Sequence, residues 1–250
     1  MAWQTPKTDW AAADGVRNTD FNRIEGNILE LYNTALTHTE IQLYVAPSGN
    51  DTTGTGTSTL PYRTVTKALS AIPRNLNGGS ATINVVAGTY SETPSIKGFT
   101  GPLVLSLSGT ATITSITVED CTVIHTGSLL TLTPPANGVG LTLQNGAAWV
   151  SSANVTVTAG AKGILVQHGS RLSATGTVTI SNTTVNGIEV LGASTAYAYN
   201  LTGTNNITAV SSSGGGIVYY GLMSIAGTTR TFTTHGGRIF SGPQMAIPSN

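Results

Sequence analysis

The sequence predicts an all-β fold: a right-handed parallel β-helix of about seven coils, preceded by an N-terminal α-helical segment and an N-terminal capping helix. Three observations lead to this prediction. Similar stretches recur at coil spacing, short strands that alternate apolar and polar residues are separated by Gly, Asn and Ser, and only 9% of the residues are charged. Such a repeat is typical of a solenoid, in which each coil buries its apolar side chains against its neighbours.

The first module, residues 1–40, is predicted to be an extended arm followed by a helix. Its apolar residues recur at steps of three and four positions, the spacing of a coiled-coil a/d seam. The seam residues are Phe21, Ile24, Ile28, Leu31 and Ala35. Because isolated helices of about 12–15 residues are marginally stable, we expect the seam to pack against copies of itself around a three-fold axis or against a larger assembly. The alternative is a short amphipathic helix that folds back on its own domain.

The second module, residues 41–80, is predicted to contain a first strand, a Gly/Thr/Ser-rich loop and a capping helix. Val65, Ala68, Leu69 and Ile72 give this helix one apolar face at the α-helical period. A β-helix exposes backbone edges and core side chains at its open end. An amphipathic helix directly before the first coil is therefore expected to cover that end.

The third module, residues 81–250, is the predicted β-helix. Its clearest repeat begins at Gly140-Leu141 and returns at Gly163-Ile164, Gly187-Ile188 and Gly216-Ile217, at offsets of 23, 24 and 29 residues. Residues 155–160 and 178–183 also match at an offset of 23. Earlier coils are expected to start with three related stretches, residues 83–90, 103–110 and 122–129. A two-sheet sandwich could also use short alternating strands, but it would not need the same start to return at coil spacing.

Composition restricts the partners and the location of the chain. Eleven basic and eleven acidic residues give zero net charge, so nothing favours nucleic acid as a partner. No apolar run approaches the ~18 residues of a membrane helix, so membrane insertion is not expected. Lys7 and Asp9 lie where a signal peptide would need an apolar run. We therefore expect synthesis in a cytoplasm, with any release as part of a particle freed by lysis.

Two segments resemble known families. The opening WQTPKTDW…NTDFNRIEGNI resembles the N-terminus of tail, collar and baseplate fibre proteins of phages that infect Gram-positive hosts. The stretch YVAPSGNDTTGTG…PYRTVTKAL is similar to the start of pectin-lyase-like β-helix domains of tailspikes and surface adhesins. The resemblance implies a bacteriophage virion protein. It also implies a homotrimer that is anchored to tail, neck or capsid proteins through residues 1–40 and projects its β-helix outward.

The β-helix offers few groups for catalysis. Its only acidic residues are Glu92, Glu119, Asp120 and Glu189, and hydrolysis of a glycosidic bond usually needs two carboxylates roughly 5–9.5 Å apart. Glu119 and Asp120 are neighbours, which point to opposite faces of a regular strand. We expect no catalytic residues. The alternative is a tailspike-like polysaccharide depolymerase, a glycoside hydrolase or lyase, whose groups meet across subunits.

No metal or cofactor is expected. His38, His125, His168 and His235 lack the spacing of a metal or triad site. His168 belongs to a Gln-His-Gly turn that parallels the Gln-Asn-Gly turn at residues 144–146. Cys121, the only cysteine, is expected to be a small buried apolar residue. The Gly-rich loop at residues 49–56 lacks the Gly-Lys-Ser/Thr ending of a phosphate-binding loop and is interpreted as a flexible connection.

Four tyrosines are the candidate glycan-binding residues. Tyr197 and Tyr199 lie in the coil that the repeat stretches to 29 residues, and Tyr219 and Tyr220 follow in the next coil. Loops that interrupt a repeat often carry function, and aromatic rings can stack on the sugars of a host surface polysaccharide. The alternative is that some of these rings face the core or a subunit contact.

The most consistent function is therefore a structural virion fibre or spike that aids attachment to the host surface. A depolymerase is the second hypothesis. A third, a non-viral bacterial surface adhesin, is disfavoured because neither a signal peptide nor a wall-anchoring signal is visible.

Overall fold

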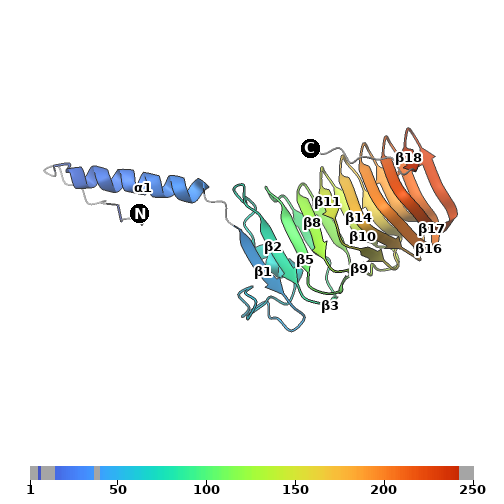
Figure 1. The fold of residues 1–250 in the computed structure, drawn as a ribbon, viewed down its shortest axis with the longest axis horizontal. Helices are drawn as coiled ribbons and strands as arrows, with labels where there is room; N and C mark the ends of the chain where they lie inside the picture. The colour runs from blue at the N-terminus through green and yellow to red at the C-terminus, as the bar shows by residue number, and fades with distance from the viewer. Residues whose placement is uncertain (1–4, 7–14, 37–39, 242–250) are drawn as a thin grey trace.

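A computed structural model describes residues 5–6, 15–36 and 40–241, and for residues 32–36, 226, 230 and 232 it describes the backbone alone. The fold class is confirmed. The chain is mostly β and forms a parallel β-solenoid of about seven coils, with one helix at the N-terminus and one before the first coil (Figure 1). The handedness of the coil stays a prediction.

Each coil passes through three strand positions, which gives the solenoid three faces. Three long strands turn corners and contribute to more than one face: β14 (Arg171–Ile180), β16 (Thr195–Ser213) and β17 (Ile217–Thr234). Every pairing between successive coils is parallel. Parallel strands that leave and return to the same face need a crossover connection, and here the other two sides of the coil provide it.

Face 1 contains the starts of β14, β16 and β17 and six further strands. These strands are β1 (Ile41–Val45), β2 (Ala81–Val85), β5 (Leu103–Leu107), β8 (Thr122–Gly127), β11 (Ala148–Ser151) and β18 (Arg238–Ser241).

Face 2 contains the second parts of β14, β16 and β17 and four strands of three residues. These are β3 (Gly88–Tyr90), β6 (Ala111–Ile113), β9 (Leu130–Leu132) and β12 (Val155–Val157).

Face 3 contains the last parts of β16 and β17 and five further strands. These are β4 (Ser95–Lys97), β7 (Ile116–Glu119), β10 (Val139–Gln144), β13 (Lys162–Val166) and β15 (Asn186–Leu191).

The register of face 1 gives the length of each coil. The differences between paired residues are 22, 20, 26, 23, 24, 22 and 21 residues. The pairs are Ala81–Leu103, Leu103–Val123, Val123–Trp149, Trp149–Leu172, Leu172–Ala196, Ala196–Val218 and Val218–Ile239. Seven coils are therefore complete before β18 begins another.

The predicted 29-residue coil does not exist. The repeat from Gly140 to Gly187 is correct, since Leu141 pairs with Ile164 and Ile164 with Ile188 on face 3. Ile188, however, pairs with Val210, only 22 residues later. Ile217 pairs with Thr195 on face 1, so Gly216-Ile217 starts a different side of the coil. Tyr197 and Tyr199 consequently lie in the regular strand β16 and not in an insertion.

The interior is an apolar column. On every face the inward residues are Leu, Ile, Val or Ala in most coils, and many of them have no exposed surface. Residues along a strand alternate between inside and outside, which produces the buried–intermediate–buried pattern of β2, β5 and β6. Burial of this apolar surface is the main stabilising contribution to a fold with so few charges.

The corner between faces 3 and 1 repeats a left-handed backbone conformation. Asp120, Asn145, His168 and His235 have φ of +51°, +56°, +55° and +49°. Asn and Asp adopt this conformation more readily than most residues. The interpretation of His168 as a turn residue equivalent to Asn145 is therefore confirmed.

The predicted capping helix is α2 (Val65–Ala71), which packs at β1 and β2 with Val65, Ala68 and Leu69 buried. Thr64 is its N-cap, with a hydroxyl that accepts a hydrogen bond from Lys67 N at 3.1 Å. The carboxylate of Glu92, in the first coil, accepts hydrogen bonds from Val65 N (2.7 Å) and Thr66 N (2.9 Å). These bonds satisfy backbone donors that a helix leaves unpaired in its first turn, so Glu92 fastens the cap to the solenoid.

The N-terminal helix α1 (Asn18–Leu36) lies beyond the first coil, separate from the solenoid (Figure 1). Its first turn is closed by Asp20, whose carboxylate accepts a hydrogen bond from Arg17 N (3.0 Å) and pairs with Arg23 (3.3 Å). A carboxylate at this end also interacts favourably with the helix dipole. Most of the arm before α1 lies outside the described residues.

Candidate functional site

The predicted seam of α1 is exposed. Phe21, Ile24, Ile28 and Leu31 are between 48% and 62% exposed, and all four belong to the a/d pattern. The fifth seam residue, Ala35, lies in the helix, but its side chain is outside the described residues. An amphipathic helix normally buries its apolar face. Among the described residues these four side chains stay about half exposed or more, unlike the apolar face of α2, whose Val65, Ala68 and Leu69 are buried.

Two of the four candidate tyrosines form an aromatic ladder on face 1. Tyr197 pairs with Tyr219, and Tyr219 pairs with Phe240 in the following coil. Their ring centroids are 4.8 and 5.0 Å apart, with interplanar angles of 14° and 16°. This separation matches the distance of about 4.7–4.9 Å between neighbouring strands. The Arg171 guanidinium lies 5.6 Å from the Tyr197 centroid and extends the ladder by one coil.

The ladder limits what these rings can contact. Each inner ring face is covered by the next ring or by Arg171, so the outward edges of the rings form the accessible surface. Stacked aromatic pairs contribute about 0.5–1.5 kcal/mol beyond area burial, which makes the ladder a source of stability for the last coils. Phe240 and Arg171 were not among the candidates, because only the strand register reveals that they lie beside Tyr219 and Tyr197.

Tyr199 and Tyr220 lie apart from the ladder. Tyr220 pairs with Ala198, which belongs to an inward row of face 1. Tyr199 is 64% exposed at the corner between faces 1 and 2. Tyr199 is therefore the candidate whose ring is most open to a ligand, and glycan binding by the tyrosines stays a prediction.

The acidic residues of the coils are held in separate structural contacts. Glu119 forms an ion pair with Lys97 (3.1 Å) and accepts a hydrogen bond from Asn145 Nδ2 (2.8 Å). The hydrogen bond from Asn145, followed by that from Lys97, lowers the pKa of Glu119. Glu189 accepts a hydrogen bond from Asn186 (2.8 Å) and pairs with Lys162.

The strand register keeps Glu119 and Glu189 apart. Glu189 pairs in register with Leu165, whereas Glu119 pairs with Gln144, so the two acids are at different strand positions and several coils apart. Asp120 lies at the corner with a left-handed backbone, and Glu92 caps α2. Within the described residues, no three His, Cys, Asp or Glu side chains gather where they could hold a metal ion.

The histidines are dispersed. His168 and His235 are exposed corner residues, and His38 lies outside the described residues. His125 is fully buried in β8, where its Nδ1 is 2.8 Å from the hydroxyl of Ser151. Because the Ser151 hydroxyl donates to Ala153 O (2.8 Å), Nδ1 carries the proton in this pair. Desolvation lowers the pKa of His125 to about 4.

The burial of His125 predicts a specific loss of stability in acid. In the unfolded chain its pKa is near 6.5, so the unfolded state takes up a proton below that pH while the folded state does not until about pH 4. The free energy of unfolding should therefore fall as the pH decreases from 6.5 to 4, by on the order of 3 kcal/mol at pH 4. Urea unfolding followed by circular dichroism across this range measures the effect.

His125→Leu should flatten that pH dependence, because Leu cannot bind a proton and Leu105 already occupies the same inward row. The control is His168→Asn, an exposed corner position at which Asn145 shows that asparagine is compatible. Equal pH dependence in the parent chain and His125→Leu would contradict the assignment.

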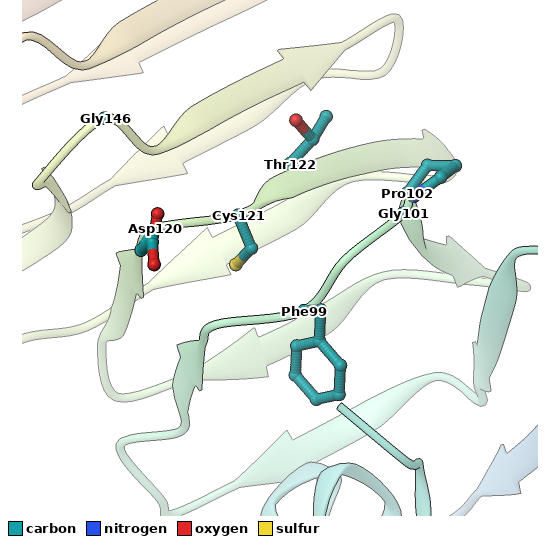
Figure 2. A pocket seen from close by; sticks show the side chains of 7 residues that line it. All are labelled: Phe99, Gly101, Pro102, Asp120, Cys121, Thr122 and Gly146. Carbon is teal, nitrogen blue, oxygen red and sulfur yellow. The ribbon is translucent and has the colours of Figure 1, made fainter. Parts of the chain in front are cut away.

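One pocket of about 330 Å³ lies at the corner between faces 3 and 1. Figure 2 shows Asp120, Cys121 and Thr122 on one coil, with Phe99, Gly101 and Pro102 on the coil below and Gly146 on the turn above. Cys121 is buried as expected, and burial raises the pKa of its thiol. A buried, protonated thiol is a poor nucleophile, so Cys121 is not activated for covalent chemistry in this pocket.

Neither described helix is long and apolar enough to cross a membrane. No protein-family model matches the chain, and no curated protein or solved structure matches it. The solenoid is compatible with a β-helix domain. The resemblance to phage fibre and spike proteins therefore rests on the two sequence segments alone.

Proposed function

We propose that this protein is a structural fibre or spike of a bacteriophage virion. Residues 1–40 associate with two further copies and with neighbouring virion proteins, and the β-helix projects outward, where it aids attachment to the host surface. The observation that carries the proposal is the exposed a/d seam of α1, on a helix that lies apart from the solenoid (Figure 1).

The seam residues do not by themselves fix the number of strands. With Phe21 at an a position, Ile24 falls at d and Ile28 at the next a. Isoleucine at both positions favours trimers or tetramers in parallel coiled coils, whereas Ile28 at a followed by Leu31 at d is the combination that favours dimers. The choice of three strands therefore follows the resemblance to trimeric fibres. Because so short a helix is marginal alone, three solenoids arranged around one axis would stabilise it by holding the helices at a high local concentration.

The contacts of the acidic residues support a non-enzymatic role over the depolymerase alternative. Glu92, Glu119 and Glu189 each hold a structural contact: Glu92 with the first turn of α2, Glu119 with Lys97 and Glu189 with Lys162. Incubation with host-type glycans, followed by detection of reducing ends or unsaturated sugars, tests this part of the proposal. Turnover would favour the depolymerase.

The double variant Ile24→Asp/Ile28→Asp should convert the trimer into a monomer. Two buried carboxylates per helix cannot be accommodated in an apolar seam. The molar mass measured by light scattering should fall threefold, while the β circular dichroism signal is retained. The same variant should be missing from assembled particles.

Leu29→Asp is the matched control. Leu29 is 51% exposed on the same helix but lies outside the a/d pattern, so the trimer should persist. A parent chain that is monomeric at micromolar concentration, or a double variant that remains trimeric, would overturn the seam assignment.

A further inference from the structure

Face 2 presents an unbroken row of hydroxyl groups. In every one of the seven coils, the outward residue at the centre of the face 2 strand is threonine or, in the last coil, serine. The first threonine row comprises Thr89, Thr112, Thr131, Thr156, Thr179, Thr202 and Ser224. All seven are half-buried or exposed.

A second row runs parallel to the first, two residues further along the chain in each coil and directly after strands β6, β9 and β12. Backbone hydrogen bonds keep it aligned: Thr133 N donates to Ile113 O, and Thr158 N donates to Leu132 O, each at 3.1 Å. The second threonine row comprises Thr114, Thr133, Thr158, Ser181 and Thr204. Five consecutive coils therefore repeat two hydroxyl residues separated by one residue, which is Ile, Leu or Val in four coils and Gly203 in the fifth. We call the two rows together the threonine face.

This regularity is confined to one side of the solenoid. On face 1 the equivalent central row contains Val104, Ile124, Val150 and Tyr197, and on face 3 it changes from Thr142 to Leu165 to Glu189. Hydroxyl residues also occur in these rows, at Thr82 and Ser173 on face 1 and at Thr117 and Thr142 on face 3, but other residues interrupt the rows there. The rows on face 2 are therefore a property of that surface.

Charge separates the faces in the same way. Strands β6, β9 and β12, and the parts of β14 and β16 on face 2, contain no charged residue. The ion pairs Lys97–Glu119 and Lys162–Glu189 lie on face 3. An uncharged surface has no electrostatic attraction for an acidic or basic polymer, so its ligand is expected to be neutral.

The rows are also rigid. A β-branched side chain has few χ1 rotamers, and strand pairing fixes the repeat along the axis at about 4.7–4.9 Å. The hydroxyls of Thr179 and Thr202 are 2.8 Å apart and hydrogen-bonded, and Thr204 N donates to the Ser181 hydroxyl (3.1 Å). The backbone positions that carry these hydroxyls thus recur at a constant spacing along the axis, and neighbouring hydroxyls can approach each other more closely, as those of Thr179 and Thr202 do.

We propose that the threonine face binds the surface of ice. Ice is an uncharged, rigid lattice whose oxygen atoms repeat at a spacing close to that of the coils. A flexible polymer would gain little from such regularity, whereas a crystal can engage only groups that keep its period. Each hydroxyl–water contact is weak, but water bridging costs little entropy and many contacts form simultaneously on a surface that is already ordered.

The test is the effect of the full chain on ice growth, measured as thermal hysteresis and as inhibition of recrystallisation. Thr131→Lys/Thr156→Lys places two long, charged side chains in the middle of the first row and should raise the protein concentration needed for inhibition by roughly tenfold or more. Thr131→Val keeps the shape of the side chain and removes one hydroxyl, so it should weaken the inhibition of ice growth less. It keeps the test informative if the lysine variant misfolds.

Thr142→Lys is the matched control, because Thr142 is an outward threonine at the centre of a face 3 strand. It should inhibit ice growth as the parent chain does. The proposal is overturned if the parent chain leaves ice growth unchanged, or if Thr142→Lys is as damaging as the face 2 variants. Binding of a neutral glycan that Thr131→Lys/Thr156→Lys abolishes, without any effect on ice, would also overturn it. The trimeric fibre is tested by molar mass and the threonine face by ice growth. A negative result in one measurement therefore leaves the other proposal untouched.

Discussion

Gly203→Ala is expected to destabilise the solenoid by about 4 kcal/mol, the combined range of backbone strain and overpacking. Gly203 has φ of +142°, which side-chain-bearing residues rarely adopt, and a Cβ there would lie 1.7 Å from Ile180 O in the preceding coil. The new methyl group must push coils apart. The same carbonyl accepts a hydrogen bond from Asn206 Nδ2 (2.9 Å), which this movement would also break.

The matched control is Gly192→Asn. Gly192 has φ of +59° with no atom closer than 3.7 Å to a Cβ. The same corner holds Asn145 and His168 in other coils, so asparagine should be tolerated within about 1 kcal/mol. Thermal unfolding followed by circular dichroism compares the variants, and a Gly203→Ala protein as stable as Gly192→Asn would contradict the close approach of the two coils.

Trp149→Ala should cost about 3–5 kcal/mol, the usual range for truncation of a buried aromatic residue. Trp149 has no exposed surface and occupies an inward row of face 1 between Val123 and Leu172. Its ring centroid is 5.8 Å from that of His125. Removing the indole therefore leaves a cavity at the centre of the column, which rigid neighbouring coils can fill only in part.

Two further substitutions test whether the loss of buried side-chain volume at Trp149 causes the destabilisation. Trp149→Phe keeps most of the side-chain volume and removes an indole N–H that has no hydrogen-bond partner among the described residues, so it should cost clearly less than Trp149→Ala. Val150→Ala changes the next residue, which points outward and is 40% exposed, and should cost less than about 1 kcal/mol. Similar losses for Trp149→Ala and Val150→Ala in urea unfolding would show that the inward and outward assignment is wrong.

The solenoid was predictable because its signal is repeated many times. Alternation of apolar and polar residues in each short strand, together with the recurrence from Gly140 to Gly187, specified the coils. The assignment of a strand to a face was less certain, since all three faces bury the same kinds of side chain. Gly216-Ile217 resembles the earlier starts but opens face 1, and this ambiguity produced the incorrect 29-residue coil.

The sequence could not predict which side chains contact one another between coils. The ladder of Tyr197, Tyr219 and Phe240 depends on coil lengths of 22 and 21 residues, which are known only from the register. The Glu92 carboxylate reaches Val65 N across 27 positions of sequence. Both contacts depend on which residues become neighbours after the chain has wound, and no local pattern encodes that.

Because the coils stack at a constant separation, the number of coils sets the length of the solenoid. Each coil adds one strand separation of about 4.8 Å to the rod, so gain or loss of a coil changes its reach by a fixed increment. The corner residues and inward rows repeat from coil to coil, and duplicated coils would find the same neighbours as the originals. Length can therefore evolve in whole steps while the two ends, and whatever they hold, stay unchanged.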